Sequence, residues 1–154
     1  MMIVAAVAQH LLADGFRNSG LRALASSVGI SDRMVMYYFK TKEELISAAL
    51  ALLAQQLAHQ LDQMLPAPRA SSEEIRTIML QAAKEPQVGA FLMLWFEIVG
   101  LAMRTDGPYR QTAQRILDDW LTWLQDKLGP RRAHQAPALL AQLEGELLLH
   151  LLRD

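Results

Sequence analysis

The chain has 154 residues, of which 52% are hydrophobic and 6% aromatic, and it contains no cysteine. So many apolar residues can form a substantial core, which excludes intrinsic disorder, and the lack of cysteine excludes disulfide scaffolds, cysteine-based zinc fingers and cysteine nucleophiles. Fifteen Lys and Arg against sixteen Asp and Glu give a formal net charge of −1. No chain-wide field therefore favours an anionic partner, although a local basic patch is still possible.

The apolar residues are mostly Leu, Ala and Met, which favour helices, whereas the β-favouring Val and Ile are few. No stretch alternates polar and apolar residues for long enough to form a strand. The sequence therefore predicts an all-α fold. From apolar spacing and from Gly, Pro and capping residues, helices are expected at 2–14, 21–28, 32–39, 42 to about 65, 71 or 72 to before 86, about 87–103, 109–128, and from near 137 almost to the C-terminus.

Several boundaries rest on individual residues. Gly29 can adopt the positive φ of a tight turn, and Ser31 can cap the helix that follows. Thr41 and Glu44 have the spacing of a capping box, in which each side chain accepts a hydrogen bond from the other residue's amide. Pro66-Ala67-Pro68 is expected to end the long fourth helix.

The change in helix length predicts two domains. The first three helices are short and closely spaced, so residues 1–46 are expected to form one domain and residues 47–154 a longer, more apolar one. The most apolar run, Val88–Met103, is shorter than the roughly 20 residues that a membrane span needs, and Glu97 interrupts it. The start of the chain has no signal-peptide pattern, so we expect a cytoplasmic protein that does not enter a membrane.

Residues 19–42 predict a helix-turn-helix. Gly29 makes the turn between two short helices, Leu24 and Val35 face each other, and Ile30 fills the corner. The second helix of such a motif can lie in a DNA major groove, which is about 12 Å wide. The alternative is a plain corner between two helices of a bundle.

The outward residues of this segment carry the chemistry of DNA recognition. Arg33 can donate a bidentate pair of hydrogen bonds to guanine, and a phosphate contact is equally possible. Tyr37 and Tyr38 are more typical of phosphate contacts or of partial burial than of base recognition. The predicted DNA-contacting set is Ser19, Arg22, Ser31, Asp32, Arg33, Met34, Tyr37, Tyr38, Lys40, Thr41 and Lys42.

The stretch from Ile3 to Leu50 resembles the DNA-binding module of the TetR family of bacterial transcriptional regulators. The residues that carry the resemblance are Gly15-Phe16, Leu21-Arg22-Ala23-Leu24-Ala25, Val28-Gly29-Ile30-Ser31, Tyr38-Phe39 and Lys42-Glu43-Glu44-Leu45. The resemblance implies a homodimeric repressor whose helical second domain binds a small apolar effector. Such a protein would bind a double-stranded DNA operator and release it when the effector binds.

The chain departs from the family pattern in places that affect DNA binding. Many members have Tyr where this chain has Met36, and a small residue and Thr where it has Arg33 and Met34. Residues 1–46 contain five basic and four acidic residues, a net charge of 5 − 4 = +1. We therefore expect weak non-specific DNA binding by one chain and a strong dependence on dimerisation.

The last two predicted helices carry more apolar surface than one chain is expected to cover. A symmetric dimer that packs these helices against their partners would bury it, and ordinary packing within one chain is the alternative. The predicted interface residues are Ile116, Leu117, Trp123, Leu124, Leu140, Leu143, Leu147 and Leu151. The polar residues Gln114, Arg115, Asp118 and Asp119 are expected to face solvent.

The effector site is expected among the fourth to seventh helices, where adaptable Met and aromatic side chains occur. The candidate lining residues are Leu53, Leu57, Ile75, Met79, Phe91, Trp95, Glu97 and Trp120. Each of the apolar ones could equally be plain core. Glu97 could bind a cationic apolar ligand, although a structural hydrogen-bond acceptor is the more ordinary role for it.

No other chemistry is indicated. The four histidines are far apart and lack metal-ligand spacing, and no phosphate-binding loop or local catalytic constellation occurs. We therefore expect no metal, no cofactor and no enzymatic activity. The competing hypothesis is a helical dimerisation or adaptor protein without an effector site, and an enzyme of unknown type is a distant third.

Overall fold

The computed structural model of the chain describes residues 2–65, 69–104 and 106–153, apart from the side chain of Arg17. Every regular element in these residues is helical, which confirms the all-α prediction. The elements are α1 Met2–Asp14, η1 Phe16–Asn18, α2 Leu21–Val28, α3 Asp32–Tyr38, α4 Lys42–Met64, α5 Ser72–Ala82, α6 Pro86–Ala102, α7 Pro108–Leu128, η2 Ala133–Gln135 and α8 Ala136–Arg153. The predicted break at Pro66-Ala67-Pro68 lies outside the described residues.

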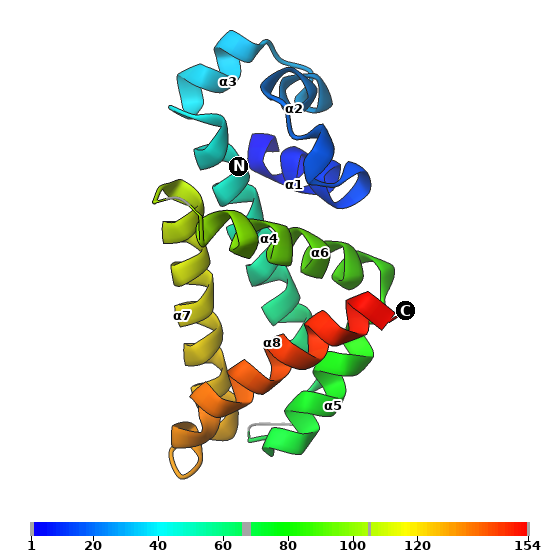
Figure 1. Cartoon of the computed structure of the whole chain (residues 1–154), viewed down its shortest axis with the longest axis vertical. Coiled ribbons are helices and arrows are strands. Elements are labelled where there is room, and N and C mark those ends of the chain that lie inside the picture. The colour runs from blue at the N-terminus through cyan, green and yellow to red at the C-terminus, as the bar shows by residue number, and fades with distance from the viewer. Residues whose placement is uncertain (1, 66–68, 105, 154) are drawn as a thin grey trace.

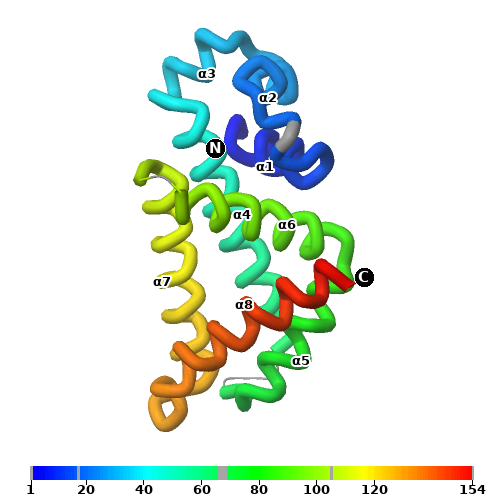
Figure 2. The backbone as a smooth tube through the Cα atoms, viewed as in Figure 1, coloured from blue at the N-terminus to red at the C-terminus, as the bar shows by residue number. Residues whose placement is uncertain are grey.

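The molecule is elongated, with helices α1, α2 and α3 gathered at one end (Figure 1). Helix α4 passes from this end into the second half of the molecule, where it packs against α7, α6 and α5. The last helix, α8, packs against α5, α6 and α7, and the trace in Figure 2 shows it running diagonally from the end of α7 towards α5. The second half therefore forms a helical bundle around the carboxyl-terminal part of α4.

The turn between α2 and α3 has the predicted geometry. Gly29 adopts a left-handed conformation with φ 72°, and the Ser31 hydroxyl accepts a hydrogen bond from the Met34 amide at 3.2 Å. Leu24 and Val35 are fully buried, and Ile30 packs against the same core. These contacts fix the angle between the two helices and confirm the predicted helix-turn-helix.

The predicted capping box at the start of α4 is only half formed. The Thr41 hydroxyl accepts a hydrogen bond from the Glu44 amide at 3.1 Å, as predicted. The Glu44 carboxylate, however, accepts from the Lys40 amide at 3.0 Å and not from Thr41, because it reaches one residue further back. The reciprocal box occurs at α5, where Ser71 and Glu74 each accept from the other's amide, at 3.2 and 2.7 Å.

Two prolines begin helices that were predicted to start one residue later. Helix α6 starts at Pro86 and α7 at Pro108, because proline tolerates the first helical position, where no amide hydrogen bond is needed. The short 3₁₀ helices Phe16–Asn18 and Ala133–Gln135 were not predicted. They change the direction of the chain after α1 and before α8.

Helix α4 connects the two halves of the molecule. Its early residues Leu45, Ile46 and Leu50 are fully buried, and its later residues Leu57 and Leu61 are also in the core. The predicted boundary between residues 46 and 47 therefore lies within a continuous helix. The helix also packs against α1, so it contacts elements of both halves.

The prediction that one chain cannot cover the apolar faces of its last two helices is wrong. Ile116, Leu124, Leu143 and Leu147 are 1–4% exposed within a single chain. The reason is that α7 turns its apolar side towards α4 and α6, while α8 packs against α5, α6 and α7. The other predicted interface residues are half-buried against the same core, namely Leu117, Trp123, Leu140 and Leu151.

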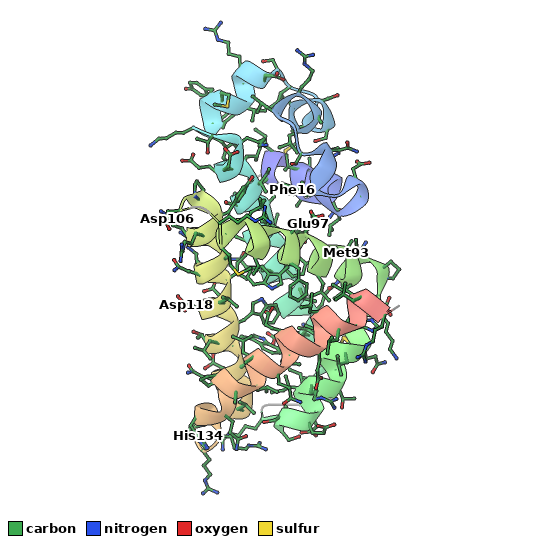
Figure 3. The ribbon with its side chains drawn as sticks, viewed as in Figure 1. Phe16, Met93, Glu97, Asp106, Asp118 and His134 are labelled. Carbon is green, nitrogen blue, oxygen red and sulfur yellow. The ribbon has the colours of Figure 1, made fainter. Side chains whose placement is uncertain are left out.

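The polar face of α7 lies in solvent, as predicted. Gln114, Arg115, Asp118 and Asp119 are exposed, and Figure 3 shows Asp118 on the outer side of the helix. In the described residues, no individual helix has both the length and the apolar composition of a membrane span. Helices α5 and α6 taken together meet those two criteria, with a bend of 99° between them.

Candidate nucleic-acid interface and apolar cavity

Helix α3 presents an uncovered face at the narrow end of the molecule. Arg33 is exposed there, and Met34, Tyr37 and Tyr38 are 45%, 80% and 60% exposed. The two tyrosine rings contact each other edge to face, with centroids 5.3 Å apart. Such a face offers guanidinium and phenol groups to a partner, because none of these side chains is needed for the core.

Most of the predicted DNA-contacting residues are exposed or partly exposed, but one is buried. Ser19 is 3% exposed, so its side chain cannot reach a phosphate, and its inclusion in the set is wrong. The cap position of α2 is occupied by the next residue, Gly20. The exposed members are Arg22, Ser31, Arg33, Met34, Tyr37, Tyr38 and Lys40, and the half-exposed members are Asp32, Thr41 and Lys42.

The start of α4 adds a cation to this surface. The Lys42 ammonium lies 4.0 Å from the Glu43 carboxylate, at the limit of an ion pair. Exposed pairs of this kind contribute little and break easily, so Lys42 can turn towards a phosphate at small cost. Met36, 41% exposed on α3, is a further surface residue that the prediction omitted.

A second feature is an apolar cavity inside the helical bundle. Its volume is about 30 Å³, and its walls come from α4, α5, α6, α7 and α8. All but one of the lining residues are apolar or aromatic. They are Leu57, Met79, Phe91, Leu92, Trp95, Trp120, Trp123, Leu124, Leu140, Leu143, Glu144 and Leu147.

The structure brings five of the eight predicted effector residues together at this cavity, namely Leu57, Met79, Phe91, Trp95 and Trp120. Three others lie elsewhere. Leu53 borders a separate hollow next to α1, and Ile75 is fully buried in the core. Glu97 is exposed on the side of α6 away from α8, close to the exposed Met93, so it does not line the cavity (Figure 3).

The acidic residue at the cavity is Glu144, which the prediction missed. Its Oε2 accepts a hydrogen bond from the Trp95 indole N–H at 2.9 Å. Burial raises the pKa of Glu144, although the Trp95 hydrogen bond works in the opposite direction. A sequence signal was available, because Glu144 falls one turn after Leu140 and one turn before Leu147, inside the apolar stripe of α8.

Trp123, which forms one wall of the cavity, is hydrogen-bonded to the carboxylate of Asp62. The Trp123 indole N–H donates to Asp62 Oδ1 at 2.7 Å, and the Lys127 ammonium lies 2.7 Å from the same oxygen. Burial alone would raise the pKa of Asp62, but the hydrogen bonds from Lys127 and Trp123 outweigh it and lower that pKa. Trp123 also contacts Trp120 edge to face, with centroids 5.4 Å apart, so the two rings brace each other.

The first turn of α7 contacts the amino-terminal domain. The Tyr109 ring packs edge to face on Phe16, with centroids 6.0 Å apart. Burial, together with the nearby Glu43 carboxylate, raises the pKa of Tyr109 to about 12. The Tyr109 hydroxyl and the Ser47 hydroxyl are buried without a hydrogen-bond partner in the described residues, so this junction contains polar atoms that a different packing could satisfy.

Glu144→Gln should stabilise the protein at neutral pH and have little effect in acid. Because the folded protein raises the pKa of this carboxyl, the stability that the group contributes is fully present below its usual value of 4.5 and is lost as the pH rises through the higher folded value. Gln cannot ionise and can still accept the Trp95 hydrogen bond. Thermal unfolding at acid and at neutral pH measures the difference.

Glu146→Gln provides the matched control on the same helix. Hydrogen bonds from Gln142 and Arg76 lower the pKa of Glu146, so its contribution to stability is present above 4.5 and is lost as the pH falls. This variant should therefore melt below the parent at neutral pH. A shift of both variants in the same direction at neutral pH would show that burial is not what governs Glu144.

Comparison with known proteins agrees with this arrangement. The model of the bacterial regulatory proteins of the tetR family matches residues 3–49. A transcriptional regulator from Rhodococcus sp. Rha1 superposes with a TM-score of 0.75 at 20% identity, covering 99% of this chain and 83% of that one. A Rhodococcus sp. protein assigned to the TetR family of transcriptional regulators superposes with a TM-score of 0.75 at 21% identity, covering 98% and 86%.

A third solved structure is that of the multidrug binding protein EbrR complexed with imidazole. It has a TM-score of 0.71 at 20% identity, and the match covers 96% of this chain and 78% of that one. No curated protein sequence is significantly similar to the chain. Residues 3–49 thus belong to the tetR family of bacterial regulatory proteins, and the chain as a whole has the fold of a TetR-family transcriptional regulator.

Proposed function

We propose that the protein is a homodimeric repressor that binds a double-stranded DNA operator and is released from it by a small hydrophobic effector. The observation that carries this proposal is the course of α4. The helix begins with Lys42 beside α3 and continues without a break to Leu57, which lines the cavity. An effector that displaces α4 would therefore move the DNA-binding surface as well.

On the DNA side, α3 would enter the major groove with Arg33 towards the base edges and Tyr37 and Tyr38 towards the phosphates. The net charge of +1 over residues 1–46 gives little non-specific attraction. Two copies are therefore needed to reach useful affinity. A symmetric dimer would recognise two half-sites one helical turn, about 34–36 Å, or a multiple of it apart.

The dimer contact is proposed on the outer face of α8, since most of the side chains first assigned to the interface are in the core. This face has small residues in its first half and exposed leucines in its second. In a single chain these residues are exposed to solvent. Its members are Ala138, Ala141, Gly145, Leu148, Leu149 and Leu152, and the leucines are 40%, 47% and 74% exposed. Small residues allow close approach of two α8 helices, and exposed apolar strips of this kind commonly mark interfaces.

On the effector side, the cavity of about 30 Å³ is far smaller than the roughly 300–1,000 Å³ of pockets that bind drug-sized ligands. The effector would therefore bind an opened form of the bundle and shift the population towards it. Met79 is the most adaptable lining side chain, because it is unbranched. Leu140 and Trp123 are half-exposed, which favours an opening between α7 and α8.

Helix α7 offers a second connection between the cavity and the DNA-binding domain. Trp120 and Leu124 line the cavity, while Tyr109 at the other end of the helix packs on Phe16. In this proposal the junction has a second packing, in which the Tyr109 and Ser47 hydroxyls gain the hydrogen-bond partners that they lack among the described residues. Opening of the bundle would then select the second packing.

The alternative function is a helical dimerisation or adaptor protein without an effector site. The observation that favours it is the small cavity, because tight packing of side chains is also what an ordinary core requires. In this case α8 would still pair two copies, and the bundle would serve only to hold the DNA-binding domains at a fixed spacing.

A thermal-shift screen with small apolar aromatic compounds separates the two functions. A ligand at 100 times its Kd stabilises the folded state by about 2.7 kcal/mol, which corresponds to roughly 5–10 °C for a protein of this size. We expect at least one compound to raise the melting temperature and to reduce retention of DNA on the protein. Unchanged melting across the whole panel would favour the adaptor and contradict an effector site.

A further inference from the structure

The cavity is lined by one carboxylate and three indoles, and no cationic side chain of the described residues pairs with that carboxylate. Glu144 Oε2 accepts the hydrogen bond from Trp95, while the other carboxylate oxygen accepts none from the described residues. No Lys, Arg or His among those residues lies within 4.0 Å of the Glu144 carboxylate, because the ion pairs of the described residues all involve other acidic groups. A carboxyl group thus faces an apolar space without a cationic partner among the described residues.

The contrast with Glu146 shows that the environment, not the helix, leaves Glu144 unpaired. Two residues further along α8, the Glu146 carboxylate receives two hydrogen bonds from the Arg76 guanidinium, at 2.8 and 2.9 Å. An unpaired carboxylate in an apolar site costs stability, and burial does raise the pKa of Glu144. A loss of stability of this kind is common where a side chain has a role in ligand binding and none in folding.

The aromatic walls fit the same ligand chemistry. Trp95, Trp120 and Trp123 all line the cavity, and indole faces attract cations more strongly than other aromatic rings. Trp123 already has the Lys127 ammonium 5.8 Å from its ring centroid. The wall is therefore electronically suited to a positive group, and the remaining lining of Leu, Met and Phe suits an apolar body.

We propose that the cavity binds lipophilic organic cations, with the positive group between the Glu144 carboxylate and the surrounding indoles and the apolar part among the leucines. This inference rests on the proposed function and assigns the chemical class of its effector. Because the cavity is small as it stands, the cation would enter an opened form and replace the missing counter-charge of Glu144. A neutral compound of the same shape would gain only the apolar contacts.

Two compounds of nearly identical shape test the charge. Benzyltrimethylammonium is a cation, and neopentylbenzene replaces its nitrogen by carbon. All three tryptophans of the chain line the cavity, so intrinsic tryptophan fluorescence of the intact protein reports binding directly. We expect the cation to bind the parent, and Glu144→Gln to weaken it at least tenfold while changing the Kd of neopentylbenzene less than twofold.

The surface variant Glu146→Gln is the control and should leave both Kd values unchanged. If Glu144→Gln left cation binding intact, or weakened both compounds equally, Glu144 would not be a cation site and the inference would fail. Binding of neopentylbenzene without the cation would also overturn the inference, but it would leave a neutral effector and the proposed function standing. Binding of neither compound would contradict both the inference and this cavity as the effector site.

Discussion

Trp95→Ala should lower the free energy of unfolding by about 3–5 kcal/mol. Trp95 is 3% exposed, and its indole forms one wall of the cavity. Truncation removes that buried surface, enlarges the cavity and deprives Glu144 of its only hydrogen-bond donor among the described residues. Urea denaturation of the parent and the variant measures the loss directly.

The same variant should regain stability when indole is added. A compound that fills the enlarged cavity stabilises the folded state by about 1.4 kcal/mol at ten times its Kd. Trp95→Phe is the control, because it keeps an aromatic ring and leaves less space for indole. If Trp95→Ala unfolded within about 1 kcal/mol of the parent, or gained nothing from indole, the description of this cavity as a space closed by Trp95 would be incorrect.

Arg33→Ala should weaken binding to the operator by about 1–3 kcal/mol per half-site and weaken binding to random DNA much less. Arg33 is exposed on α3 and forms no side-chain hydrogen bond or ion pair with the other described residues that the substitution would disturb. The loss would therefore come from the base contact. Competition binding with operator and random duplexes at one salt concentration gives both values.

Arg22→Ala is the matched comparison, since Arg22 is exposed on α2 and belongs to the predicted DNA-contacting set. Because it lies outside α3, we expect it to contact phosphate and not a base edge. This variant should weaken binding to operator and to random DNA equally. It should also reduce the slope of log affinity against log salt concentration by about one. An equal loss on both duplexes for Arg33→Ala would instead make Arg33 a phosphate contact. In that case sequence recognition would rest on Met34, Tyr37 and the shape of the DNA.

The features predicted correctly from the sequence are those decided over a few residues. A left-handed Gly29 followed by the cap Ser31 leaves the chain few choices, so the turn and the start of α3 follow from local geometry. The start of α5 was predicted only as residue 71 or 72, and the structure begins the helix at Ser72 with Ser71 as its cap. The error at Glu44 shows the limit, because two amides one residue apart compete for the same carboxylate.

The predictions that failed concern features that depend on which helices pack against each other. The apolar faces of α7 and α8 predict that something covers them, but only the packed structure identifies α4, α5 and α6 as the cover. Glu97 and Glu144 both interrupt apolar stretches. The direction of each side chain decides their roles, and Glu97 falls on the exposed side of α6 with Met93 while Glu144 falls on the inner stripe of α8.

Selection of binding sites from a pool of random DNA duplexes tests the proposed function most directly. The intact protein should enrich an inverted repeat whose half-sites are centred about 10 base pairs, or a multiple of that, apart, because two α3 helices of a symmetric dimer must each meet a major groove. Enrichment of no sequence would contradict a repressor that binds a specific operator. Enrichment of a single half-site without its repeat would contradict the proposed dimer on α8.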